Sequence, residues 1–218
     1  MAEEFTALGT AFIMMVVDFS KMAFEFKKFL GLDSSQAFPA LNIAENKLCY
    51  ADSRFDFSII ADSDWKYKDS VQAVYKHSDN RHEISIKESV YNLALGGDIN
   101  ALYSIAHEVS HWGIINLFKF DFGLSEFNKL NAMSQSFLVG IHENMANLLT
   151  VLLVCGEEEL EKAQSARELS LSSCMDEAQL SLALFYFKNR AMLAQNYINN
   201  IAPKIWEQNQ IQRRLKNA

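Results

Sequence analysis

The chain has 218 residues, which fits one large domain or one domain with a helical extension. Half of the residues are hydrophobic and 22% are charged, so the chain can bury a substantial core, and this composition excludes a largely disordered protein. The formal net charge of -7 provides no basic surface for a phosphate backbone, so we expect no direct nucleic-acid partner.

The cysteines and the short apolar segments bear on location. Cys49, Cys155 and Cys174 are widely spaced and form no CxxC pair, so they indicate neither a disulfide framework nor a thiolate zinc site. The apolar residues 11–17 are too few to span a bilayer, and the acidic residues near the start lack the positive region of a signal peptide. We therefore expect a soluble cytoplasmic protein with no membrane partner, and the sequence leaves its oligomeric state open.

The first 32 residues have the pattern of an amphipathic helix. Large apolar side chains recur there every three or four positions, at Phe5, Leu8, Phe12, Met15, Phe19, Met22, Phe26 and Phe29. Gly31 fits a C-cap, and residues 33–36 with Pro39 mark a break before the next element. We predict a helix over residues 1–32 that packs on the core, although a partner or membrane surface would have the same pattern.

The middle of the chain changes to the pattern of strands. Residues 55–59 and 82–86 alternate between apolar and polar side chains, as half-buried strands do, and they predict a small twisted sheet. After residues 96–98 the helical period returns and continues almost to the C-terminus. This order predicts an α+β fold that is mostly helical, with a main domain over residues 33–155 and a C-terminal helical region over residues 156–218.

The chemistry centres on His107-Glu108-Val109-Ser110-His111, which matches the HExxH pattern. The motif lies in a segment that is apolar nearly all round, so we expect a buried helix. Histidines four residues apart lie on one face, with Cβ atoms about 5–6 Å apart, and both can reach one metal ion. Glu108 lies about 100° round the helix from His107, which suits a general base acting on metal-bound water.

A chance match is the alternative, because so short a motif arises in on the order of one chain per hundred of this size. The two histidines would then be core residues bonded to backbone carbonyls, with Glu108 paired to one of them. Left unsatisfied, these groups would cost several kcal/mol in so apolar a helix, and a bound zinc ion removes that cost. We therefore interpret His107 and His111 as metal ligands.

Candidates for a third ligand lie in residues 141–147. Glu143 shares a face with small and polar side chains, which a second helix could approach closely, whereas the main apolar stripe runs through Ile141 and Met145. Periodicity alone favours a solvated surface carboxylate for Glu143. His142 is the nearest rival, and because its side chain points about 100° away from that of Glu143, only one of the two should bind.

Three features together resemble the ImmA/IrrE-like metallopeptidases: Asp98, residues 101–112 (ALYSIAHEVSHW) and residues 143–147 (ENMAN). In that family a Gly-Asp turn leads into AHELGH and an ExxAN helix follows. The resemblance implies a zincin-like catalytic domain over residues 33–155. It also implies that Zn2+ is bound by His107, His111 and Glu143, and that Glu108 is the catalytic base.

The resemblance covers residues 81–153, roughly a third of the chain, and it departs from the family pattern at two places. Ser110 stands where the family usually has Gly, and residues 149–151 (LTV) replace the usual LLMP ending. The resemblance also implies that the strand around residues 84–86 is the edge strand bordering a substrate cleft, where a peptide could lie antiparallel. Tyr91 and Tyr103 are candidates for stabilising an oxyanion, but nothing in the sequence places the hydroxyl of either one.

The implied activity is limited cleavage of a partner regulatory protein, for example a helix-turn-helix repressor. A second hypothesis is a metal-bound regulatory or binding protein that keeps the zincin fold with little or no peptidase activity. A third is a helical interaction module formed by residues 176–197, although core helices have the same pattern. We interpret the basic residues 213–216 as a solvated helix end.

Overall fold

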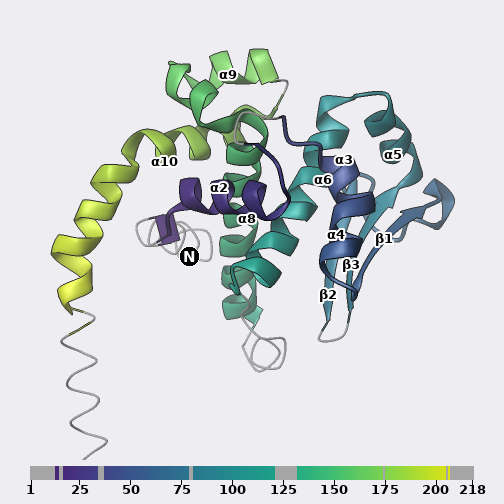
Figure 1. Ribbon diagram of the computed structural model, residues 1–218, viewed down its shortest axis with the longest axis horizontal. Coiled ribbons are helices and arrows are strands. Elements are labelled where there is room, and N and C mark those ends of the chain that lie inside the picture. Colours follow the sequence, from purple (N-terminus) through teal and green to yellow (C-terminus); the bar gives the residue numbers. More distant parts are fainter. Residues whose placement is uncertain are drawn as a thin grey trace, which may run out of the picture.

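The computed structural model describes residues 13–14, 17–33, 37–78, 81–120, 132–173, 175–204 and 206. Helices predominate and accompany one small sheet, so the predicted α+β class is confirmed (Figure 1). In chain order the elements are α2 (Phe19–Phe29), α3 (Ala40–Asn42), η1 (Ile43–Lys47), α4 (Leu48–Ala51), β1 (Phe55–Ile60), η2 (Asp62–Asp64), β2 (Ala73–Ser78), β3 (Arg81–Lys87), α5 (Glu88–Leu95), α6 (Ile99–Trp112), η3 (Gly113–Leu117), α8 (Ala132–Lys162), α9 (Ala166–Ser173), α10 (Glu177–Asn196) and η4 (Tyr197–Ile201).

The sheet has three strands in the order β1-β3-β2. β1 runs parallel to β3, and β2 pairs antiparallel with β3 in a hairpin. The two strands predicted from alternation are confirmed as β1 and β3. The prediction that residues 84–86 form the edge strand is wrong, because β3 is paired on both sides and Ile84, Ser85 and Ile86 are all buried. The edge strand beside α6 is β2.

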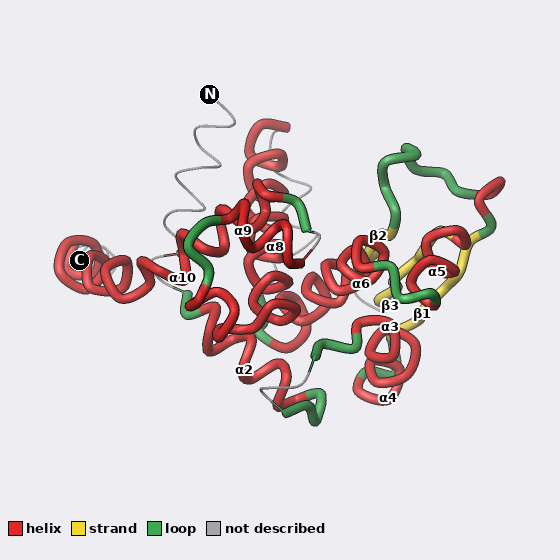
Figure 2. The backbone as a smooth tube through the Cα atoms, turned by 90° about the horizontal axis from the view of Figure 1, so that it is seen from above, coloured by secondary structure: helices red, strands yellow, loops and turns green. Residues whose placement is uncertain are grey.

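Helix α6 lies at the centre of the molecule. The sheet and helices α3 to α5 lie on one side of it, and α2, α8, α9 and α10 lie on the other (Figures 1 and 2). Ile105 and Val109 of α6 are fully buried in the same core as Ile84 and Ile86 of β3. Because α6 is covered on both sides, it needs apolar residues nearly all round, as its sequence has.

Helix α2 begins at Phe19, where Asp18 caps it by accepting the N–H of Lys21 at 3.0 Å. Val17 and Asp18 are not helical, so the predicted helix across the first thirty residues is interrupted here. Its part over residues 1–12 lies outside the described residues. Gly31 follows the end of α2 with φ of 66°, a conformation that favours glycine in this position.

Phe26 fixes α2 against the end of α6. Its ring is fully buried and stacks on that of Trp112 at a centroid distance of 6.2 Å. The same ring lies against Gly113, where an added Cβ would come within 2.6 Å of the Phe26 Cε1 atom. Glycine at this position therefore lets the two elements pack closely.

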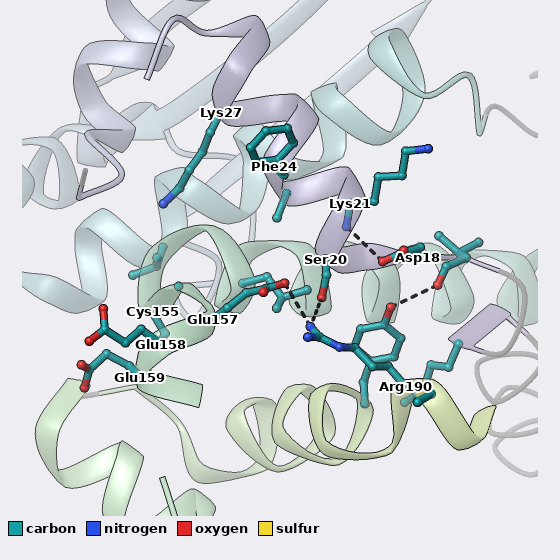
Figure 3. Close-up of a pocket in the computed structure, with 18 of the residues that line it drawn as sticks. Asp18, Ser20, Lys21, Phe24, Lys27, Cys155, Glu157, Glu158, Glu159 and Arg190 are labelled. Carbon is teal, nitrogen blue, oxygen red and sulfur yellow. Dashed lines mark hydrogen bonds and ion pairs between the residues drawn. The ribbon is translucent and has the colours of Figure 1, made fainter. Parts of the chain in front are cut away.

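Two side chains of α10 connect it to α2 and α8. Arg190 Nη1 donates to Ser20 Oγ at 2.7 Å and pairs with Glu157 at 3.0 Å (Figure 3). Tyr186 Oη accepts the N–H of Phe19 at 2.8 Å. A pocket lies among these three helices, and its described lining contains none of the predicted metal ligands.

Helix α8 is the longest described element and leaves helical geometry at Gly156, which has φ of 74°. Among the described residues it is also the one helix long and apolar enough to cross a membrane, over Gln135–Lys162. Half of its apolar window is buried inside the structure, and core helices pass the same test of length and composition.

Candidate metal centre

The start of α6 sets the phase of the HExxH residues. Gly97 has φ of 84°, and Asp98 caps the helix by accepting the N–H of Ala101 at 2.9 Å. From this cap the helix continues without a break to Trp112. His107 and His111 therefore lie one turn apart on the same face of a buried helix.

His107, His111 and Glu143 converge at one point between α6 and α8. The His107 Nε2 and His111 Nε2 atoms are 3.0 Å apart, and Glu143 lies 3.2 Å from the first and 3.5 Å from the second. Their three ligand atoms all lie within 4.8 Å of one another, so this group could hold a metal ion. The side chains of His107 and His111 are 15% and 8% exposed, whereas that of Glu143 is 50% exposed, which leaves the site open on one side.

Small residues allow α6 and α8 to approach each other. Ser110, Ala146 and Thr150 are fully buried, and the Ser110 and Thr150 hydroxyl oxygens are 2.9 Å apart. Ser110 donates to the carbonyl of Ala106 at 2.9 Å. The one hydroxyl proton of Thr150 can be donated to Ser110 or to the carbonyl of Ala146, which lies 2.7 Å away. The two departures from the ImmA/IrrE-like pattern thus meet in one buried polar contact, next in sequence to the candidate ligand His111.

Glu108, on α6, points toward the sheet. Its Oε2 atom accepts the backbone N–H of Tyr75, on β2, at 2.6 Å, and the residue is 9% exposed. Burial raises the pKa of Glu108, although the nearby His111 and His107 act in the opposite direction. A carboxylate held between the metal ligands and an edge strand can exchange a proton with a group bound there.

The electrostatics of the three converging side chains favour an ionised carboxylate beside imidazole. Burial disfavours charge on Glu143, but hydrogen bonds to His107 and His111 hold its pKa well below the usual range. The pKa of His107 is raised, because its contacts with Glu143 and Glu108 outweigh the desolvation that would lower it. The two pKa directions together favour an ion pair between Glu143 and His107.

His142 lies behind His111 rather than beside Glu143. Its Nδ1 atom is 3.0 Å from the Nδ1 atom of His111, and the two rings stack at a centroid distance of 5.0 Å. His111 presents its other nitrogen, Nε2, to His107 and Glu143. If His111 binds a metal ion, His142 would be its outer partner, a position that fixes ring orientation.

The two tyrosines considered for an oxyanion have other partners. Tyr91 Oη donates to Glu45 at 2.7 Å. Tyr103 Oη lies 3.4 Å from Asn147, whose side chain contacts His107, and burial raises the pKa of Tyr103. Tyr75 is the residue that sequence reasoning missed, because its contact with Glu108 is made by the backbone, which no residue pattern encodes.

Comparison of the chain with models of protein families, with curated proteins and with solved structures finds no match in any of the three. The resemblance to the ImmA/IrrE-like metallopeptidases therefore depends on the HExxH and ExxAN motifs. What the geometry adds is independent of it: His107, His111 and Glu143 meet at a point where a metal ion could bind.

Proposed function

We propose that this protein is a zinc-dependent metallopeptidase with a zincin-like core, which hydrolyses a peptide bond in a protein substrate. The observation that carries the proposal is the convergence of His107, His111 and Glu143 within 4.8 Å, next to the buried carboxylate of Glu108. Two imidazoles and one carboxylate form the ligand set of many catalytic zinc sites, which keep a fourth position for water or substrate.

The donor set supports zinc over harder cations, since imidazole nitrogens supply two of the three ligands and magnesium and calcium prefer oxygen. When bound, zinc would lower the pKa of a bound water and polarise the scissile carbonyl. Glu108 would accept the proton of that water and pass it to the leaving amine. The raised pKa of Glu108 supports this role, because a group that both takes and gives a proton works best near neutral pH.

The edge strand β2 supports a peptide as the substrate. The Tyr75 N–H donates to Glu108 and therefore points away from β3, and by alternation Ala73 and His77 direct their backbone groups the same way. An extended peptide could add to this edge through main-chain hydrogen bonds. Its backbone would then run past Glu108, at the side of the metal ligands.

The family resemblance extends the proposal to limited cleavage of one regulatory protein in the cytoplasm, and a helix-turn-helix repressor encoded nearby is the first candidate. The test is co-expression of each such regulator with the wild type or with Glu108→Gln, followed by analysis of the regulator for cleavage. Gln preserves the size of the side chain but cannot accept the proton, so we expect zinc and fold to be kept and cleavage to be lost.

The loss should be on the order of 10²–10⁴-fold, the usual contribution of general acid-base catalysis. A regulator cut equally by both proteins would overturn the role of Glu108. A regulator bound by both and cut by neither would favour the second hypothesis, a metal-bound regulatory or binding protein without peptidase activity.

A further inference from the structure

His77 and His82 face each other across the β2–β3 hairpin, outside the site described above. They are register partners in the antiparallel pair. Farther along the same ladder the Lys87 N–H donates to the Gln72 carbonyl at 3.2 Å, so Gln72 and Lys87 form a hydrogen-bonded pair. His77 and His82 lie an odd number of positions from that pair. Because hydrogen-bonded pairs alternate along the ladder, His77 and His82 form a non-hydrogen-bonded pair. At such positions the two side chains approach each other most closely.

Three atoms that could bind a metal ion lie close together at this pair. His77 Nδ1 lies 3.0 Å from His82 Nδ1, and Tyr75 Oη lies 2.9 Å from the same His82 atom. The separation between the two imidazole nitrogens equals that between His107 Nε2 and His111 Nε2. Two nitrogens each about 2.0–2.1 Å from a shared zinc ion lie at a similar separation.

Hydrogen bonding alone satisfies His82 poorly. Its side chain is 1% exposed, and its Nδ1 atom, which has one in-plane lone pair when unprotonated, is faced by both Tyr75 Oη and His77 Nδ1. Its other nitrogen, Nε2, has no hydrogen-bond partner within bonding distance and lies 3.6 Å from the Asp52 carboxylate. A cation at the point where the three donors meet would satisfy all of them at once.

The surroundings resemble the outer shell of a metal site. Asp52 lies behind His82, as a carboxylate behind a metal-binding imidazole commonly does, and Arg54 holds it in place at 3.0 Å. Asn116 Nδ2 donates to Tyr75 Oη at 2.9 Å, which leaves that oxygen directed at His82. His82 is thus oriented by one group and Tyr75 by another.

We propose that His77 Nδ1, His82 Nδ1 and Tyr75 Oη bind a second metal ion, a divalent transition metal such as Zn2+ or Cu2+. Imidazole suits both ions, and the phenol of Tyr75 would release its proton on binding. The backbone of Tyr75 donates to Glu108, so an ion bound to its side chain would also fix the position of β2 beside the first centre.

The test separates the two centres by disabling the first. The double variant His107→Ala/Glu143→Ala, freed of metal by chelation, is titrated with Zn2+, and bound zinc is measured per chain. We expect about one zinc to remain, and we expect the added substitution His77→Ala to remove it. His77 is used because it is only half-buried, whereas replacing the fully buried His82 would confound metal loss with unfolding.

Tyr75→Phe in the same background tests the third ligand. It should weaken zinc binding by more than the roughly 10–100-fold that loss of an outer-shell partner costs. Tyr91→Phe is the matched control and should leave binding unchanged, because its hydroxyl binds Glu45. A folded double variant that binds no zinc would overturn the proposal and leave a hydrogen-bonded network at this place. That result would not affect the proposed site of His107, His111 and Glu143, whose metal is counted separately in the wild type.

Discussion

The hydroxyl groups of Ser110 and Thr150 meet at 2.9 Å in the buried contact between α6 and α8. These helices carry different candidate ligands, His107 and His111 on α6 and Glu143 on α8. The distance between the helices therefore controls whether three ligand atoms can reach one ion.

Ser110→Leu tests this relationship. The larger side chain would push the helices apart in a fully packed contact, so we expect a loss of about 1–3 kcal/mol in the free energy of unfolding. Zinc affinity should fall as well, since Glu143 moves away from the histidines. Ser110→Gly, the residue usual in the family, is the control and should keep the metal. Thermal unfolding and zinc titration measure both effects, and unchanged zinc affinity in Ser110→Leu would contradict the account.

His142 should tune the metal centre without binding the ion. Because its Nδ1 contacts the Nδ1 of His111, we expect His142→Ala to keep the zinc stoichiometry and to weaken affinity by roughly 10–100-fold. Competition with a chelator of known affinity measures this. If His142→Ala released the metal completely while Glu143→Ala retained it, the third ligand would be His142.

The stability of the metal-free protein should depend on pH through Glu143 and His107. In the metal-free protein the pKa of Glu143 lies below its ordinary value of 4.5, so its contribution to stability is present above that value and is lost as pH falls through the folded pKa. The raised pKa of His107 acts in the opposite sense: its contribution is present at low pH and is lost as pH rises through that value.

Zinc competes with the proton on His107, so zinc affinity should decrease as pH falls through the raised pKa of that imidazole. Zinc titrations between about pH 5 and pH 8 measure this effect. Glu143→Gln serves as the comparison, since it removes the carboxylate that raises the pKa of His107. This variant should bind zinc more weakly, and its zinc affinity should change less steeply with pH in the upper part of this range. A zinc affinity independent of pH in the wild type would contradict the assignment of His107.

The sequence predicted β1 and β3 because their apolar and polar residues alternate, but it gave no comparable signal for β2. The second half of β2 is Lys76-His77-Ser78, which has no apolar residue. Its place at the edge depends on pairing with β3 in a hairpin, and this pairing is a tertiary property. The assignment of residues 84–86 to the edge failed for the same reason.

The candidate site likewise has a part that the sequence predicts and a part that it does not. The spacing of His107 and His111 on one helix is local, so four residues of sequence predict their approach. Glu143 is half exposed and has the pattern of a surface carboxylate. Predicting that it meets the histidines therefore depended on the resemblance to the ExxAN motif. The contacts of Tyr75 with Glu108 and of His142 with His111 join separate elements, and neither follows from periodicity. The predictions for residues 1–12 and 213–216 lie outside the described residues.

We propose that His107, His111 and Glu143 together hold one zinc ion. The most direct test is the zinc content per chain of the purified wild type beside Glu143→Ala, under identical metal loading and dialysis, with folding checked by circular dichroism. We predict a difference of about one zinc per chain, whatever the hairpin site binds, with His107→Ala and His111→Ala showing the same loss. Equal zinc content in the wild type and a folded Glu143→Ala would contradict the claim.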